Sequence, residues 1–520
     1  MNNPPAIISI ESPPSFQNVR DIEIATKALN GEHYLPYFGY VRLKGETDFE
    51  LAAPNPTNTH QLWFHSLPST HALLWAYKNT RENIYAQAAF DLLEKYLSWL
   101  QQQPEHHPAW SDEHAVTNRL RLLNYCSSGI AHEKFSLPSS LSEAIAAAAE
   151  AHAEWLYNDA HYMWNNHGLM MDRALLEAAV SLADTAPQKR ERWTQHSVLR
   201  SRKLLLKTFD SKGCCTENSP SYFHLNLMLF RDFSSFCRNI GMEDVFGAET
   251  ERLRKAENIA GLFVRTDGTL ATVGDTELHS THWIDRAGLS KIVGTAAFPE
   301  SGFFIHKTND TYLTAKCGGS SFNHRHIDET SITLQRSGID FIIDAGLYNF
   351  LQNTEKLSRW FRPFRAHSGI FTEDCDGVLF AKFDGPTSLG SMSEINHSSE
   401  LGTFVNMTSN LSRQAHIERR IAIAEGGKIV LYDQIASVGD MPVDWRLQFL
   451  VPAECTICDV PGGYTIASGG HRLTLLQKHA TGVISKSHRS RNFGECEEAQ
   501  LIRFAGSDIR KELVTELYFE

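Results

Sequence analysis

The residues most suited to chemistry are the two histidines of the motif His324-Arg325-His326-Ile327-Asp328. Two alternating runs, residues 331–335 and 339–343, follow this motif, and the short turn Arg336-Ser337-Gly338 separates them. This pattern predicts a β-hairpin. Folding of the hairpin brings the histidine motif close to Asp344, which comes directly after the second strand.

Three side chains of this region have the types that bind a transition metal: His326, Asp344 and His367. His367 precedes another strand-like run, residues 368–372. Imidazole nitrogens and a carboxylate that converge from separate strands suit a borderline-soft cation such as zinc. The alternative is a polar cluster at the mouth of the hairpin. We expect one zinc ion, with water or a further protein group as the fourth ligand.

Two motifs in the first half of the chain are candidates for binding or acid–base chemistry. Asn166-His167-Gly168 is expected in a loop before a helix that begins at Leu169, where the alternative is an asparagine N-cap with an incidental histidine. Ser219-Pro220 is expected to open a further helix, with Ser219 as its N-cap. Tyr222 then lies in the first turn, where the helix dipole favours the phenolate. Its alternative role is a partly buried aromatic cap.

The elements that position these residues change in type near Pro299. Apolar residues recur at helical spacing before it, and alternate with polar residues after it. The helical segments expected are residues 71–102, 141–156, 169–182 and 194–208, and the strands are 303–305, 311–315, 331–335, 339–343, 403–407, 420–424, 428–433, 445–451 and 473–477. Many successive helices favour an α/α toroid over a four-helix bundle, and the strands favour an antiparallel β-sandwich. We expect domains at 1–299 and 300–520.

Composition excludes several classes of protein. The 520 residues exceed what one compact core usually accommodates, and a net charge of −12 argues against nucleic-acid binding. We also expect no membrane partner, because no run of about 18 apolar residues occurs. The start of the chain lacks signal-peptide features, so we expect a cytoplasmic protein, or a periplasmic or secreted one if a leader is missing. The nine cysteines form no repeating framework, which favours free thiols.

Taken together, the motifs resemble those of the heparinase II/III-like polysaccharide lyases, a family that includes oligo-alginate lyases. The best matches are Asn166-His167-Gly168, Ser219-Pro220-Ser221-Tyr222, His324-Arg325-His326-Ile327-Asp328, Ile343-Asp344-Ala345-Gly346 with Tyr348, and Arg365-Ala366-His367. Trp63 and Arg119 resemble cleft-lining residues of the family more weakly. Arg325 departs from the pattern, since glycine is usual between the two histidines, and it leaves the substrate class open.

The resemblance implies an incomplete N-terminal (α/α) toroid, a C-terminal antiparallel β-sandwich, and β-elimination at a uronic acid. Asn166 and His167 would neutralise the uronate carboxylate, and His167 is also a candidate base. Tyr222 would act as base or as acid, and His324 would assist it.

The remaining implied residues bind metal or substrate. His326, Asp344 and His367 would hold a structural Zn²⁺ that fixes the strand carrying His324. The candidates for contact with an acidic polysaccharide or oligosaccharide are Trp63, Arg119, Arg325 and Tyr348.

Two other functions remain open at this stage. A glycoside hydrolase on an α/α toroid needs a pair of carboxyl groups, and Glu217 and Asp172 are present but form no obvious pair. A catalytically inactive carbohydrate-binding protein is the second alternative. The sequence also leaves open which uronate polymer is bound, exo or endo action, the base and acid assignment, and the oligomeric state, a homodimer included.

Overall fold

A computed structural model of the chain describes residues 21–43, 49–50, 58–132, 134–183, 187–278, 285–349, 358–375 and 384–520. The chain divides into two compact units. The first comprises Met1–Leu205 with Leu229–Thr250, and the second comprises Leu206–Met228 with Glu251–Glu520. This division does not coincide with the change from helix to strand, because the second unit includes the first residues of helix α10 (Pro220–Asn239).

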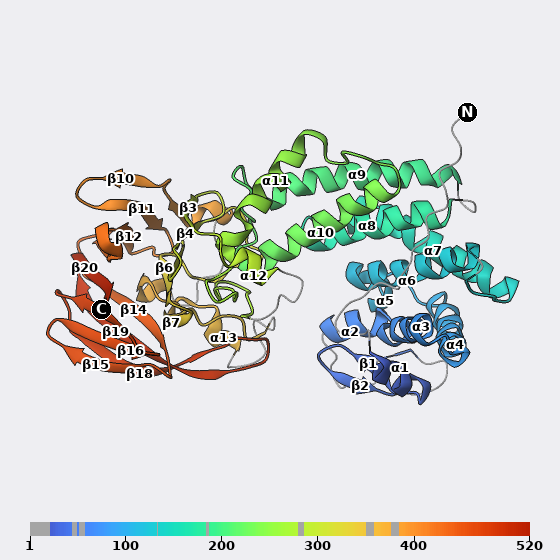
Figure 1. Cartoon of the computed structure of the whole chain (residues 1–520), viewed down its shortest axis with the longest axis horizontal. Helices are drawn as coiled ribbons and strands as arrows, with labels where there is room; N and C mark the ends of the chain where they lie inside the picture. The colour runs from blue at the N-terminus through green and yellow to red at the C-terminus, as the bar shows by residue number, and fades with distance from the viewer. Residues whose placement is uncertain are drawn as a thin grey trace. The chain divides into compact units, whose positions relative to one another are not determined.

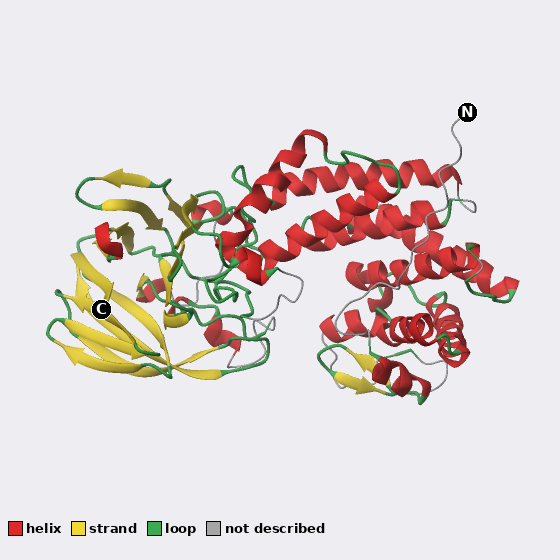
Figure 2. Ribbon diagram, viewed as in Figure 1, coloured by secondary structure: helices red, strands yellow, loops and turns green. Residues whose placement is uncertain are grey.

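Helices dominate the described part of the first unit (Figure 2). They are α1 (Ile22–Leu29), α2 (Asn58–His65), α3 (Pro68–Thr80), α4 (Asn83–Leu100), α5 (Pro108–Ser111), α6 (Glu113–Ala131), α7 (Ser139–Tyr157), α8 (Asn166–Ser181), α9 (Pro187–Thr208) and the second half of α10. A short hairpin of β1 (His33–Leu35) and β2 (Gly39–Val41) accompanies them. Helix α6 packs against both α7 and α8, which places the start of α6 beside the start of α8.

The helix expected over residues 71–102 is two helices, α3 and α4. Arg81 adopts a left-handed conformation with φ 62°, and its N–H bonds to the carbonyl of Tyr77. This conformation ends α3, because a residue with positive φ cannot continue a right-handed helix. The apolar spacing persists across the break, so periodicity alone did not reveal it.

The second unit consists mainly of antiparallel sheets, coloured yellow to red in Figure 1. A five-stranded sheet has the order β3-β4-β5-β6-β7, and a four-stranded sheet has the order β18-β19-β14-β8. A nine-stranded sheet has the order β10-β11-β12-β13-β20-β17-β16-β15, with β9 paired to β11.

The strands are β3 (Gly294–Phe298), β4 (Phe303–Lys307), β5 (Thr311–Lys316), β6 (Ser331–Arg336), β7 (Ile339–Ile342), β8 (Ile370–Thr372), β9 (Gly390–Met392), β10 (Asn396–Ser398), β11 (Gly402–Ser409), β12 (Ala415–Ile423), β13 (Ile429–Ser437), β14 (Val443–Pro452), β15 (Thr456–Val460), β16 (Gly463–Ser468), β17 (His471–Gln477), β18 (Gly482–Arg489), β19 (Glu497–Asp508) and β20 (Arg510–Phe519). Three short helices belong to this unit as well, α11 (Thr250–Ile259), α12 (Arg286–Leu289) and α13 (Ser358–Phe361). Apolar side chains of all three sheets meet in one core, among them Phe304, Ile417 and Phe449.

The predicted hairpin at the histidine motif is confirmed as β6 and β7. Arg336 pairs with Ile339 across a two-residue turn, in which Ser337 has φ 48° and Gly338 has φ 78°. Two central residues with positive φ make a type I′ turn, whose twist matches that of the flanking strands. Within the described residues, no helix combines the length and the apolar character that crossing a membrane requires.

Candidate functional site

A buried carboxylate, that of Asp275, joins the two histidines of the motif. Its Oδ1 accepts hydrogen bonds from Nε2 of His326 at 2.9 Å and from Nη2 of Arg362 at 2.8 Å. Its Oδ2 accepts from Nδ1 of His324 at 3.1 Å and from the same Arg362 nitrogen at 3.0 Å. Burial alone would raise the pKa of Asp275, but the bonds from His324 and His326 and the charge of Arg362 hold that pKa well below its usual range.

The loop that carries Asp275 lies against two other backbone segments. Gly274 has φ 58°, and a Cβ there would lie 2.3 Å from the carbonyl oxygen of Asn218 and 2.8 Å from that of His324. Only glycine fits this close approach. The hydroxyl of Ser219 donates to the carbonyl of Asp275 at 2.9 Å, which fixes the loop to the start of α10.

Tyr222 and His324 form a stacked pair within the second unit. Helix α10 begins at Pro220, and Oγ of Ser219 accepts from the backbone N–H of Tyr222 at 3.3 Å, as the predicted N-cap requires. The two ring centroids lie 3.3 Å apart with an interplanar angle of 17°. His324 has φ 58°, an uncommon backbone state for a non-glycine residue that recurs at functional sites. Its Nε2 lies 3.5 Å from Oε2 of Glu217, so a carboxylate faces each ring nitrogen.

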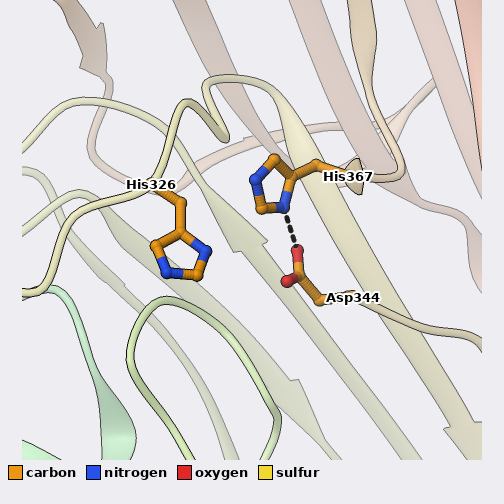
Figure 3. A group of neighbouring side chains, drawn as sticks. All are labelled: His326, Asp344 and His367. Atoms are coloured by element: carbon orange, nitrogen blue, oxygen red, sulfur yellow. Dashed lines mark hydrogen bonds and ion pairs between the residues drawn. The ribbon is translucent and has the colours of Figure 1, made fainter. Parts of the chain in front are cut away.

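The three expected metal ligands converge (Figure 3). One ligand atom from each of His326, Asp344 and His367 lies within 4.8 Å of the other two. His326 comes from the loop before β6, Asp344 from the end of the β6–β7 hairpin, and His367 from the segment before β8. Nδ1 of His367 lies 2.7 Å from Oδ2 of Asp344, the contact marked in Figure 3. All three side chains are buried.

Neighbouring groups orient both imidazoles toward this cluster. Nε2 of His326 donates to Asp275, and its Nδ1 is buried without a hydrogen-bond partner among the described residues. Nε2 of His367 donates to the carbonyl of Arg362 at 3.3 Å, which leaves Nδ1 on the Asp344 side. A second hydrogen bond of this kind is typical of histidines that bind metals.

The protonation of the cluster also fits a metal. Burial lowers the pKa of His326, so its Nδ1 carries a lone pair. Burial opposes a proton on His367 as well, but the charge and hydrogen bond of Asp344 outweigh it and raise the pKa of His367. A metal bound at Nδ1 of His367 would therefore replace a proton.

Asp328 is fully buried, and neither of its carboxylate oxygens has a hydrogen-bond partner among the described residues. The donor set of two imidazoles and a carboxylate is one that zinc accepts.

Asn166 and His167 belong to the first unit and lie in the first turn of α8. This helix begins at Asn166, three residues before the expected start at Leu169. The N-cap is Asn165, whose Oδ1 accepts from the N–H of His167 at 2.9 Å. Gly168 is required here, because a Cβ would lie 1.9 Å from the carbonyl oxygen of Met163. Nδ1 of His167 lies 2.8 Å from Oε1 of Glu113, and the side chains of His167 and Glu113 are 31% and 21% exposed.

Three of the expected substrate contacts, Arg119, Trp63 and Tyr348, differ in how far they are buried. The guanidinium of Arg119 donates to the carbonyl of His65 at 2.9 Å and to Nε2 of His152 at 3.1 Å, and its residue is 1% exposed. Trp63 is 7% exposed. Tyr348 is half-buried, and its ring stacks on Phe361.

The expectation that Arg325 touches the substrate does not fit its position. Its side chain is fully buried and forms an ion pair with Glu329. It also donates to the carbonyls of Pro386 at 3.0 Å and Gly319 at 3.3 Å. A guanidinium enclosed in this way stabilises the loop that carries the histidines.

Four residues of these sites went unrecognised as site residues in the sequence. Asp275 lies 49 and 51 positions before the two histidines that it contacts, and Arg362 lies 87 positions after Asp275. Glu113 lies 54 positions before His167. Glu217 was noted only together with Asp172, as two carboxyl groups that form no obvious hydrolase pair. The one local signal was Gly274-Asp275, a dipeptide typical of turns.

A known family matches the β-rich part of the chain. Residues 293–517 match the family described as heparinase II/III-like, C-terminal. This match identifies residues 293–517 as a heparinase II/III-like C-terminal domain. This heparinase II/III-like domain contains the histidine motif, the hairpin and all three expected metal ligands.

Solved structures match over almost the whole chain. A crystal structure of heparinase III has a TM-score of 0.79 at 14% identity, covering 100% of this chain and 87% of that one. A heparinase III with methylated lysines has a TM-score of 0.76 at 13% identity, covering 99% and 86%. A mutant heparan sulfate lyase of Pedobacter heparinus has a TM-score of 0.72 at 15% identity, covering 97% and 83%. At these identities the match concerns the fold, and it confirms the predicted toroid and β-sandwich. No curated protein matches the sequence significantly.

The first prediction concerns Asp275→Asn. An amide has one acceptor oxygen where the carboxylate has two, so its NH₂ group would face a donor of His324, His326 or Arg362. We expect zinc affinity and turnover each to fall about 10- to 100-fold, as for other groups that orient metal ligands. Zinc titration and kinetics measure the two losses. Asp440→Asn, on the exposed β13–β14 turn, is the control. If Asp275→Asn changes neither zinc affinity nor turnover, the prediction is wrong.

The second prediction concerns the metal. Protein purified without chelator should contain one zinc ion, and its removal should lower the melting temperature before it lowers activity, because the ligands join three segments of the β-domain. Elemental analysis and melting curves with and without chelator measure this. His326→Ala should lose the ion, whereas His397→Ala, at an exposed strand, should keep it. Metal-free protein with unchanged stability would exclude the site.

Proposed function

We propose that this protein is a polysaccharide lyase that cleaves a uronate-containing acidic polysaccharide by β-elimination. The observation that carries the proposal is the stacked pair of Tyr222 and His324, in which Asp275 orients the imidazole. The pair places a phenol and an imidazole, two groups that transfer protons, in direct contact. Support also comes from the heparinase II/III-like domain and from the fold, which the heparan sulfate lyase of Pedobacter heparinus shares.

In the proposed reaction a base removes the proton on C5, next to the uronate carboxylate. The C4–O bond to the neighbouring sugar breaks, a C4=C5 double bond forms, and an acid protonates the leaving oxygen. Tyr222 serves as the base or the acid, and His324 assists it. Asp275 stays ionised and keeps Nδ1 of His324 as a donor, so this nitrogen takes no part in the proton transfer.

For the helical unit we propose the role that the resemblance implies. Asn166 donates a hydrogen bond to the uronate carboxylate, and His167 supplies a second polar contact through its exposed edge. Withdrawing charge from that carboxylate stabilises the enolate-like intermediate that forms when the C5 proton leaves.

Neither Asp275 beside His324 nor Asp172 in the first unit suits the role of the acid in a hydrolase. A glycoside hydrolase needs a carboxylic acid of raised pKa that can protonate the leaving group. The oxygens of Asp275 accept four hydrogen bonds, and its pKa lies well below the usual range. Burial raises the pKa of Asp172 to about 7, but this group is fully enclosed against Arg200 and Tyr162.

The proposal is tested with a panel of uronate polymers, among them heparan-type, hyaluronan-type and alginate substrates. A lyase produces an unsaturated uronate with a characteristic ultraviolet absorbance at the new chain end. New reducing ends without that absorbance would identify a hydrolase, and binding without cleavage would identify a carbohydrate-binding protein. Either result overturns the proposal.

The third prediction is that Tyr222→Phe nearly abolishes turnover and leaves substrate binding mostly intact. The ring and its stacking on His324 remain, but the hydroxyl is lost. We expect kcat to fall about 10²- to 10⁴-fold, the usual contribution of a general acid or base. Tyr432→Phe on β13 is the matched control. Retention of most of the wild-type rate by Tyr222→Phe would remove Tyr222 from the proton transfer.

The fourth prediction separates transition-state stabilisation from simple binding at Asn166 and His167. Each alanine variant should lower kcat/KM, because these groups act on charge that develops during the reaction. The expected loss corresponds to about 3–4 kcal/mol of transition-state stabilisation. Steady-state kinetics with the cleaved polymer measure the loss. His196→Ala, in the same unit but paired with Asp159, should behave as wild type. A rise in KM with unchanged kcat would recast the pair as substrate binders.

A further inference from the structure

Glu113 and His167 make a direct contact between two helix starts in the first unit. Glu113 is the first residue of α6, and the side chain of Asp112 caps that helix by accepting from the N–H of Ala115 at 2.9 Å. His167 is held at its backbone by the cap of α8. Both ends of the 2.8 Å contact are therefore anchored, which fixes the direction of the imidazole as well as its place.

The neighbouring titratable groups single out Glu113 as the charged partner. The ring of His114 lies 4.7 Å from that of His167, and burial lowers the pKa of His114 to about 3, so this ring is neutral. Burial raises the pKa of Asp112, whose Oδ1 serves the helix cap. Burial acts the same way on Glu113, but its hydrogen bond with His167 reverses the effect and lowers its pKa.

An ionised carboxylate only accepts hydrogen bonds, so Nδ1 of His167 carries the proton in this contact. We propose that Glu113 is a positioning residue, which holds His167 as the Nδ1–H form and presents Nε2 to the uronate. The inference rests on the proposed function, in which His167 acts on the substrate. Without Glu113 the ring would exchange its proton between both nitrogens and rotate about its side-chain bonds.

The test reads the proton on His167 directly. Protein labelled with ¹⁵N in histidine gives imidazole resonances that distinguish a protonated Nδ1 from an unprotonated one. The His167 signals are assigned by their loss in His167→Ala, which is needed because the chain has 24 histidines. Wild type should show Nδ1–H. Glu113→Ala should show a mixture of both tautomers, and Glu113→Gln should restore Nδ1–H, since the amide oxygen still accepts. Asp112→Asn, which keeps an oxygen that can cap the helix and leaves the contact between Glu113 and His167 in place, should still show Nδ1–H.

Kinetics on the polymer that wild type cleaves give the second measurement. We expect kcat of Glu113→Ala to fall at least about tenfold, but by less than the roughly 10²- to 10⁴-fold loss expected when the imidazole itself is removed. Glu113→Gln should recover most of that loss. Melting curves verify that each variant is folded.

The outcomes separate the inference from the function on which it rests. Unchanged His167 resonances in a folded Glu113→Ala variant overturn the inference, even if the enzyme proves to be a lyase. Unchanged kcat in a variant with mixed tautomers also overturns it, because the tautomer then has no effect on turnover. A wild-type protein that forms no unsaturated uronate overturns the proposed function and, with it, the role of Glu113 in turnover.

Discussion

The geometry of the second unit depends on one carboxylate, that of Asp275. Burying an ion costs several kcal/mol, and this cost is offset only when its oxygens are well bonded. Each oxygen of Asp275 receives one histidine N–H and one contact from Arg362. Because both histidines share the same rigid acceptor, a rotation of the carboxylate would disturb His324 and His326 together. The backbone next to Asp275 packs closely as well, since a Cβ at Gly274 would lie 2.3 Å from the carbonyl oxygen of Asn218.

This shared acceptor explains why a metal at His326, Asp344 and His367 would act structurally. The three side chains are fully buried, whereas the His324 side chain is 19% exposed and Tyr222 is partly exposed. A substrate that reaches Tyr222 therefore meets His324 and not the metal cluster. Zinc would fix the orientation of His326, and His326 in turn holds Asp275, so the ion would influence proton transfer only through the position of His324.

Local signals in the sequence predicted many of the elements but not the partners of the site residues. The I′ turn at Ser337-Gly338, the cap at Ser219 and the metal trio follow from residues close in sequence or from strand pairing. Asp275 and Arg362 join the site through tertiary contacts, which no spacing pattern encodes. Strand β18 was not expected because most of its residues are exposed, so it lacks the apolar alternation that identifies strands. Arg325 was expected at the substrate because it replaces the glycine usual in the family, whereas the partner Glu329 allows its burial.

The two candidate catalytic histidines share one arrangement on different folds. Nδ1 of His324 lies 3.1 Å from Asp275 in the β-domain, and Nδ1 of His167 lies 2.8 Å from Glu113 among the helices. In both, the carboxylate belongs to another segment of the chain, and a helix cap fixes a neighbouring backbone. A histidine held in this way keeps its proton on Nδ1, so its Nε2 is the atom left for the reaction. The two sites differ at Nε2, because that of His324 also faces Glu217 at 3.5 Å. A β-elimination needs its polar groups oriented before the C5 proton leaves, because the enolate-like charge is short-lived, and carboxylate-oriented imidazoles satisfy this need without movement during the reaction.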